Sequence, residues 1–254
     1  MEDINKLLFE NVRENSLEGV KECIEKGADG HKTSGIAGEA LITGHYEIFK
    51  YLIKNGAVIN PMFAQFVAIK GDLEGMKLLV ENGLDIKNNC RDAFISACSE
   101  GHIEIVRLFL EKEIDLNDEK NNGLFHAAIE NRDDVLRLLI DHGADVNRND
   151  TSALRWAAKY NCFQTVRTLL ENGANVNAKV EIEPNSNALM FSPVFHQSAL
   201  LNAYMKNNRE IVQLLLIYGA DHTELNLSDE EFFELFNRNE QLYNIFNRVR
   251  RRRI

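Results

Sequence analysis

The sequence has little of what marks exported, membrane-bound or metal-binding proteins. Its four cysteines, Cys23, Cys90, Cys98 and Cys162, lie far apart, and Cys98 and Cys162 fall within helical patterns rather than in pairs resembling CxxC. Because no two form a CxxC pair, buried thiols in a reducing compartment explain them better than disulfides or a metal site. The N-terminus has no basic region followed by an apolar block, and no apolar run approaches the roughly 20 residues of a membrane span. We therefore expect a cytoplasmic protein.

Motifs of catalysis are also missing. No GxSxG, HExxH, kinase-like or dinucleotide-binding pattern occurs. The stretch GADGHKTSG at residues 27–35 departs from a phosphate loop, because His31 stands between the glycine and Lys32. The seven histidines fall mostly at turns and links, where structural roles are expected. The sequence therefore predicts no enzyme, no cofactor and no metal; an enzyme or small-ligand receptor would need a deep pocket with perturbed titratable groups.

Basic residues are scarce outside the last seven positions. The chain has a formal charge of −10, from 29 lysines and arginines against 39 acids, and five of these arginines lie in RVRRRRI at residues 248–254. Removing five from 29 leaves 24 basic residues and a charge of −15 for the rest. An acidic surface of this kind attracts basic partners and repels nucleic acid. We interpret the arginine-rich tail as an exposed end that aids solubility.

With 44% hydrophobic residues, the chain is folded, and its main feature is an internal repeat. Glycine recurs at 27, 56, 83, 143, 173 and 219, with Glu113 in the remaining place, at intervals of about 30 residues. Twelve residues before each of these stands Gly or Asn in all seven cases. The seven are Asn15, Gly44, Gly71, Gly101, Asn131, Asn161 and Asn207. Gly and Asn tolerate the left-handed conformation that ends a helix, so each unit turns sharply at two places.

Helical patterns fill the space between these turns. GHIEIVRLFLEK and NRDDVLRLLIDH place apolar residues four, five, seven and eight positions after the first turn. A shorter segment before that turn carries small residues in a fixed register, which allows close helix packing; the pairs are Ala97 and Cys98, Ala127 and Ala128, and Ala157 and Ala158. Such a repeated unit predicts a stacked solenoid, since one helix pair cannot bury its apolar face alone.

The repeat resembles a known family. LFHAAIENRDDVLRLLIDHGADVN and ALRWAAKYNCFQTVRTLLENGANVN are similar to ankyrin repeats, which have one helix ending in AAxxG and a second ending in LLxxGAxxN. The resemblance covers residues 5–222 in about seven units. It implies an all-α ankyrin-repeat solenoid of stacked helix-turn-helix units. We place the repeat domain at 1–222 and a C-terminal helical cap with a basic tail at 223–254.

Several details depart from the family pattern. The TPLH stretch reads SALR at 152–155, SALL at 198–201 and DAFI at 92–95, so its hydrogen-bonding network is largely lost. Units near 30 residues rather than 33 imply shortened hairpin fingers. The ALRWAA variant is similar to repeats abundant in giant viruses of amoebae, which favours a virus or an intracellular bacterium as the source and the host cytoplasm as the location.

Both ends of the repeat are expected to be caps. Glu10, Glu14, Glu18 and Glu22 make the first unit polar, as suits a solvent-facing end. Ser228 and Glu231 form a capping box that begins a helix with Phe232, Phe233, Leu235 and Phe236, and a second helix is expected around Leu242, Tyr243, Ile245, Phe246 and Val249. These aromatics are read first as a cover for the last repeat. Docking of another protein and self-association through these helices stay open.

The resemblance also implies where a partner would bind. Ankyrin-like solenoids contact partners at the finger tips and at exposed positions just before the first turn. Here those positions are Ile69 and Lys70, Ser99 and Glu100, Ile129 and Glu130, Lys159 and Tyr160, and Met205 and Lys206. Arg155 and Tyr204 complete the set of expected contact residues. Ordinary surface is the alternative for all of them.

The largest irregularity is an insertion. The interval from Gly173 to Gly219 is 46 residues, and the extra chain, at 178–197, carries two of the three prolines beside Phe191 and Phe195. Apolar side chains on such a loop must fold back onto the stack or meet a partner. We expect Phe191 and Phe195 to contact a partner.

These observations predict a non-enzymatic protein-binding module. An adaptor or inhibitor would capture a host or cellular protein, one with a basic surface, through the concave face and the 178–197 insertion. The alternative is an acidic mimic of nucleic acid that blocks a DNA- or RNA-binding enzyme, which would make binding strongly salt-dependent. No direct nucleic-acid or membrane contact is expected.

Overall fold

The computed structural model describes residues 3–32, 34–118, 120–179 and 198–235. These residues form helices and turns, with no strand in the described ranges. The chain divides into two compact units, residues 1–115 and 116–254, which we treat separately. The boundary falls inside the region that the sequence predicts as one repeat domain, and the predicted division at residue 222 stays a prediction.

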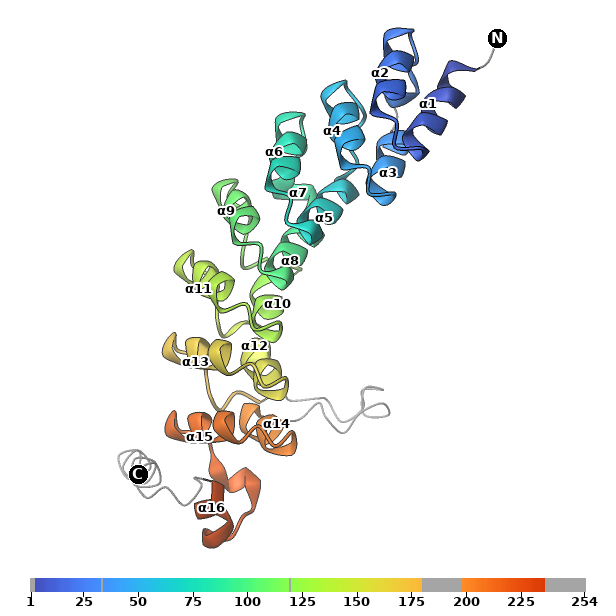
Figure 1. The fold of residues 1–254 in the computed structure, drawn as a ribbon. Helices are drawn as coiled ribbons and strands as arrows, with labels where there is room; N and C mark the ends of the chain where they lie inside the picture. The colour runs from blue at the N-terminus through green and yellow to red at the C-terminus, as the bar shows by residue number, and fades with distance from the viewer. Residues whose placement is uncertain (1–2, 33, 119, 180–197, 236–254) are drawn as a thin grey trace, which may run out of the picture. The chain divides into compact units, whose positions relative to one another are not determined.

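Both units consist of antiparallel helix pairs packed layer on layer (Figure 1). Unit 1 contains α1 (Ile4–Arg13) with α2 (Leu17–Glu25), α3 (Ser34–Ile42) with α4 (Tyr46–Lys54), α5 (Pro61–Lys70) with α6 (Leu73–Glu81), and α8 (Arg91–Glu100) with α9 (Ile103–Glu111). Its links carry the short η1 (Gly30–Lys32) and α7 (Ile86–Asn89). Unit 2 contains α10 (Gly123–Ile129) with α11 (Asp133–Asp141), α12 (Arg148–Lys159) with α13 (Phe163–Glu171), and α14 (Ala199–Met205) with α15 (Arg209–Ile217), followed by η3 (His222–Leu225) and α16 (Asp229–Leu235). The all-α repeat architecture expected from the sequence is confirmed.

The first turn of every pair is left-handed, as predicted. Asn131, Asn161 and Asn207 have φ of 54°, 63° and 59°, and the four other members of the series are also positive. At Gly71, with φ of 68°, a Cβ atom would lie 2.6 Å from the His102 ring, so this turn needs glycine for space as well as conformation. The second turns are left-handed too. Their series includes Glu113, at φ of 57°.

Glu113 is the one residue of the second-turn series with a side chain beyond glycine, and a left-handed conformation costs such a residue free energy. We expect Glu113→Gly to raise the free energy of unfolding by about 0.5–1 kcal/mol. The variant also loses an exposed ion pair with Lys87, at 3.4 Å, which is worth little. Chemical denaturation checks this result, with Glu113→Ala as the control. The alanine keeps the strain, so equal stability of the two variants would contradict the explanation.

The core of each layer follows from the small and apolar residues of the repeat. The six small residues before the first turns of α8, α10 and α12 are fully buried. The second helices present an apolar side to them, as with Val135, Leu136 and Leu139 of α11, each at most 1% exposed. Small residues on one helix and branched residues on the other allow the close packing that a single pair could not sustain.

Residues directly after the first turns bind the preceding layer. His45 Nδ1 lies 2.7 Å from the carbonyl oxygen of Val12, and His102 Nε2 lies 3.2 Å from that of Ile69. Cys162 and Asn208 play the same part in unit 2, where Cys162 Sγ donates to Ile129 O and Asn208 Nδ2 donates to Ala158 O. The structural role predicted for the two histidines is confirmed. Cys162, which the sequence pattern placed within a helix, instead precedes α13.

Three asparagines four residues after the second turns connect the links of unit 2. Asn147 Oδ1 accepts from the Asn175 backbone N–H at 2.7 Å, and its Nδ2 donates to the Gly173 carbonyl at 3.2 Å. Asn117 and Asn177 repeat both bonds one layer before and one layer after. The final Asn of the GAxxN motif is therefore a bridge between successive links.

We expect Asn147→Ala to lower the free energy of unfolding by about 1–3 kcal/mol, because two backbone groups lose their partner at once. Denaturation followed by the fluorescence of Trp156, the one tryptophan of the chain, reports this in unit 2. Asn172→Ala is the matched control, since the Asn172 amide donates back to Thr168 in its own helix. Equal losses for the two variants would contradict a bridge between layers.

The caps agree with the sequence where they are described. The four predicted glutamates of the first unit are exposed. Ser228 and Glu231 form the expected capping box, with Ser228 N–H to Glu231 Oε2 at 2.8 Å and Glu231 N–H to Ser228 Oγ at 3.3 Å. Phe232 and Leu235 of α16 are buried, and Gln213 of α15 donates to the Leu235 carbonyl. The expected second helix at 242–249, the arginine tail and Phe236 lie outside the described residues.

Candidate functional site

The ends of the first helices of unit 2 bring the expected contact residues into a row. Ile129, Lys159 and Met205 stand two residues before successive turns, and the next position holds Glu130, Tyr160 and Lys206. Because α10 packs on α12 and α12 on α14, equivalent positions lie beside one another on this side of the unit. We call these six residues the end row. Met205 is 60% exposed and Tyr160 55%, whereas Ile129 and Lys159 are half-buried.

An aromatic cluster lies at the middle of the end row. Trp156 of α12 and Tyr160, the residue that caps the C-terminal end of this helix, stack with ring centroids 5.8 Å apart and planes 24° apart. Lys159 Nζ lies 4.3 Å from the centre of the Trp156 ring and 6.0 Å from that of Tyr160. Stacking and the cation–π contact favour this arrangement of the side chains, so the cluster presents aromatic rings and a charge side by side. The sequence reading missed Trp156, although its i, i+4 spacing from Tyr160 is the signal.

The other expected residues are divided among several places. Ser99 and Glu100 end α8 in unit 1, with Glu100 exposed and Ser99 half-buried. Arg155 differs from the expectation of an exposed contact, because it is only 8% exposed and faces the interior of unit 2. Phe191 and Phe195 lie outside the described residues. Contact with a partner stays a prediction for all of them, and Arg155 is left out of the surface considered below.

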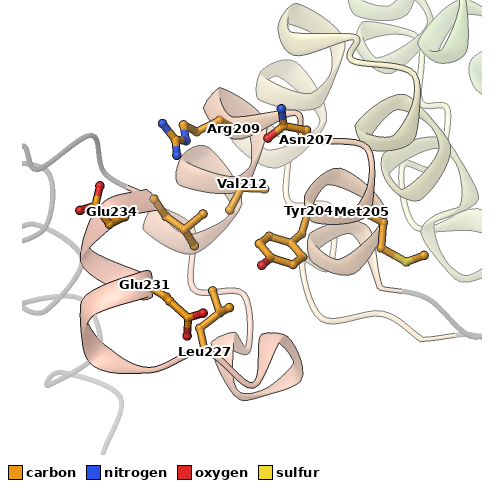
Figure 2. Close-up of a pocket in the computed structure, with 9 residues that line it drawn as sticks. Tyr204, Met205, Asn207, Arg209, Val212, Leu227, Glu231 and Glu234 are labelled. Atoms are coloured by element: carbon orange, nitrogen blue, oxygen red, sulfur yellow. The ribbon is translucent and has the colours of Figure 1, made fainter.

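Tyr204 lines a hollow of about 500 Å³ among α14, α15 and α16 (Figure 2). In Figure 2 the Tyr204 ring points toward Leu227 and Glu231, and Arg209 and Glu234 stand at other sides of the hollow. Glu231 already accepts two hydrogen bonds from Ser228, which lower the pKa of its carboxyl group. The hollow therefore combines an aromatic ring and leucine side chains with charged groups that stabilise the cap.

Groups able to catalyse or bind metal are dispersed. Within the described ranges, no three His, Cys, Asp or Glu residues come together as a metal site. The four cysteines are buried and form no disulfide. Burial raises the pKa of the Cys90 thiol to about 11 and also raises the pKa of Cys98 and Cys162, which keeps all three protonated and weakly nucleophilic. Asp133 accepts hydrogen bonds from Arg137 and Thr168, a structural network between α11 and α13.

We expect His126 of α10 to make unit 2 sensitive to acid. Burial lowers the pKa of its imidazole below the usual 6.5, partly offset by the Glu130 charge. Because the folded pKa is the lower one, stability from this group is present above about pH 6.5 and is lost as the pH falls below it. We expect His126→Gln to lose less stability than wild type between pH 7.5 and 5, measured by urea unfolding with Trp156 fluorescence. An equal loss in both proteins would contradict this.

Comparisons with known proteins agree with this geometry. Family models described as ankyrin repeats in three copies match residues 39–120, 62–150 and 97–180, and one described as ankyrin repeats in many copies matches residues 154–216. A search of curated proteins found no match. None of the helices in the described ranges has the length and apolarity needed to cross a membrane. The matched residues, from 39 to 216, span more than half of the chain and take in most of the layers described above, and the chain therefore belongs to the ankyrin-repeat family.

Proposed function

We propose that this chain is a non-enzymatic adaptor or inhibitor that captures and sequesters one target protein through the end row and the 178–197 insertion. Ankyrin repeats are protein-interaction modules, which supports protein as the class of partner. The observation that carries the proposal is the stacked Trp156–Tyr160 pair with Lys159 across it. An exposed aromatic held rigid before binding loses little conformational entropy when a partner covers it.

The neighbours of this pair fit a protein interface. Met205 lies exposed in the next layer and Ile129 half-buried in the layer before, so apolar contacts flank the aromatic rings. Glu130 and Lys206 supply exposed charges around them. An apolar and aromatic centre with a charged rim is the usual composition of a protein-binding patch. The net charge of −10 favours approach of a partner with a basic surface.

Affinity capture with quantitative mass spectrometry tests this function. The baits are wild type, Tyr160→Ala/Met205→Ala, and Phe191→Ala/Phe195→Ala. Gln164→Ala/Glu210→Ala is the matched control, because both residues are exposed on the second helices of the same unit. We expect one saturable protein partner that the control retains and the Tyr160/Met205 variant loses, with weaker capture by the insertion variant. Retention of every specific binder by the Tyr160/Met205 variant would contradict the proposal.

Acidic mimicry of nucleic acid is the second candidate, favoured by the charge of −15 outside the arginine tail. Once the partner has been captured, the salt dependence of its affinity distinguishes the two candidate functions. If the partner binds this chain in place of nucleic-acid phosphates, its affinity for the chain should fall about 10³-fold or more between 50 and 200 mM salt. Binding through the end row should lose about tenfold or less over the same range and should depend on Tyr160.

A further inference from the structure

A single carboxylate group in unit 2 contacts the chain on both sides of the insertion. Lys179 lies near the start of the insertion and Ser198 directly follows its end, while residues 180–197 lie outside the described residues. Lys179 Nζ is 2.6 Å from Glu224 Oε1, and Ser198 Oγ donates to Glu224 Oε2 at 2.5 Å. Each oxygen of the carboxylate therefore holds one end of the insertion. We call Lys179, Ser198 and Glu224 the clamp.

Two members of the clamp have little access to water. The Glu224 side chain is 16% exposed and Ser198 is 3% exposed, whereas the Lys179 side chain is 52% exposed. An ion pair on the open surface contributes little to stability, but a carboxylate that water reaches poorly depends on the groups that face it. Removing the Glu224 side chain is therefore expected to release both Lys179 and Ser198.

Both partners of Glu224 are fixed to the rest of unit 2. Ser198 is the N-cap of α14, where its Oγ also accepts a backbone N–H from the first turn at 3.1 Å. Asn177, two residues before Lys179, forms the bridge described above to the link that carries Glu224. The clamp therefore attaches the ends of the insertion to α14 and to the link after α15, two parts of the chain that the stack itself holds in place.

The repeat itself does not require a glutamate at this place. Glu224 stands five residues after the second turn at Gly219. The same position in the six earlier units holds Lys32, Pro61, Asn88, Asp118, Arg148 and Ala178. Asp118 is the one other acid in this series, and its carboxylate accepts the Lys120 backbone N–H within its own link. The glutamate therefore belongs to the unit that follows the insertion and not to the repeat pattern.

We propose that Glu224 is a positioning residue for partner binding, which acts by holding the two ends of the insertion at one place in unit 2. This role rests on the proposed function, in which the insertion contributes to the capture of a target protein. A segment whose ends are fixed has fewer conformations to lose when a partner binds it. Glu224 acts through Lys179 and Ser198, so its side chain needs no contact with the partner.

Limited trypsin digestion of the full chain tests the clamp without a partner. Trypsin binds the lysine side chain in its own pocket, so it cuts after Lys179 only when that side chain has left Glu224. We expect Glu224→Ala to speed this cleavage at least about fivefold relative to cleavage after the exposed Lys206. Glu171→Ala is the matched control, because Glu171 pairs with Arg167 within α13, and it should keep the ratio within about 1.5-fold of wild type. An unchanged ratio in Glu224→Ala would overturn the proposal.

Partner affinity shows whether the clamp acts through the insertion. The probe is the protein that wild type captures in the affinity experiment above, titrated into chains with and without Phe191→Ala/Phe195→Ala. We expect Glu224→Ala to weaken binding at least about threefold when the insertion is intact, and less than about 1.5-fold when both phenylalanines are removed. Circular dichroism confirms that each variant is folded. Lys179→Met changes an exposed side chain and releases one end, and it should show a smaller loss of the same kind.

Equal losses of affinity with and without the two phenylalanines would overturn the proposal, because Glu224 would then act on the last layer and not on the insertion. Capture of no protein by wild type would overturn the proposed function and the positioning role that rests on it. The trypsin ratio separately decides whether Glu224 holds the two ends of the insertion, so the two failures are distinguishable.

Discussion

Arg148→Ala is expected to lower the free energy of unfolding by about 2–4 kcal/mol, because one guanidinium group holds three backbone carbonyls. Arg148 donates to Leu116 O at 3.2 Å, to Asn121 O at 2.7 Å and to Asp118 O. These carbonyls belong to the link before α10, which is longer than the link before α12. Without Arg148 this link keeps the two hydrogen bonds of Asn117 but loses the three that the guanidinium group donates to it. Urea unfolding followed by Trp156 fluorescence measures the change in unit 2.

Two variants separate this role from a general effect of charge. Arg148→Lys keeps the charge but replaces the planar donor group, and we expect it to recover less than half of the loss. Arg167→Ala removes an exposed arginine whose partner Glu171 lies 2.7 Å away in the same helix, and it should cost less than about 1 kcal/mol. A loss for Arg148→Ala no larger than that for Arg167→Ala would contradict the proposed role of the link.

Phe94→Ala is expected to cost about 3–5 kcal/mol of stability in unit 1. Phe94 of α8 and Phe109 of α9 are both fully buried, and their ring centroids lie 5.4 Å apart. The variant loses this contact and leaves a cavity between the two helices of one layer, which the neighbouring layers cannot fill without moving. Far-UV circular dichroism during denaturation follows the loss.

Phe66→Ala serves as the comparison for the core substitution. Phe66 is 36% exposed on α5, so the same chemical change there should cost less than about 2 kcal/mol. The difference between the two variants isolates the effect of burial. If Phe94→Ala cost no more than Phe66→Ala, the packing described for this layer would be incorrect.

The repeat could be predicted from sequence because its signals are local. Gly or Asn twelve residues before a second glycine fixes two left-handed turns, and the apolar spacing after the first turn fixes the buried side of the second helix. The bonds between layers were harder to foresee. The Asn147 amide reaches atoms 26 and 28 residues ahead, and Arg148 reaches carbonyls 27 to 32 residues behind, so neither partner follows from a neighbouring motif.

The sequence predicted some residues of the binding surface correctly and others wrongly, because it does not determine which polar side chains are exposed. The sequence placed Tyr160 and Met205 before their turns, and both are exposed. Arg155 has a charged side chain, which suggested surface, but its position in α12 turns it toward the interior. The i, i+4 spacing of Trp156 and Tyr160 indicates only that the two side chains share one side of the helix, and their stacking is visible only in the structure. The spacing of apolar residues indicates which side of a helix is buried, but it says little about which residues on the exposed side bind a partner.

The central claim is that side chains at the ends of the first helices, held in place by the repeat, select a protein partner. The most direct measurement is calorimetric titration of the captured partner into wild type, Tyr160→Ala/Met205→Ala and the control Gln164→Ala/Glu210→Ala. The account predicts one-to-one binding that weakens at least about tenfold in the first variant and is unchanged in the control. Equal affinities for all three proteins, with the fold of each intact, would contradict it.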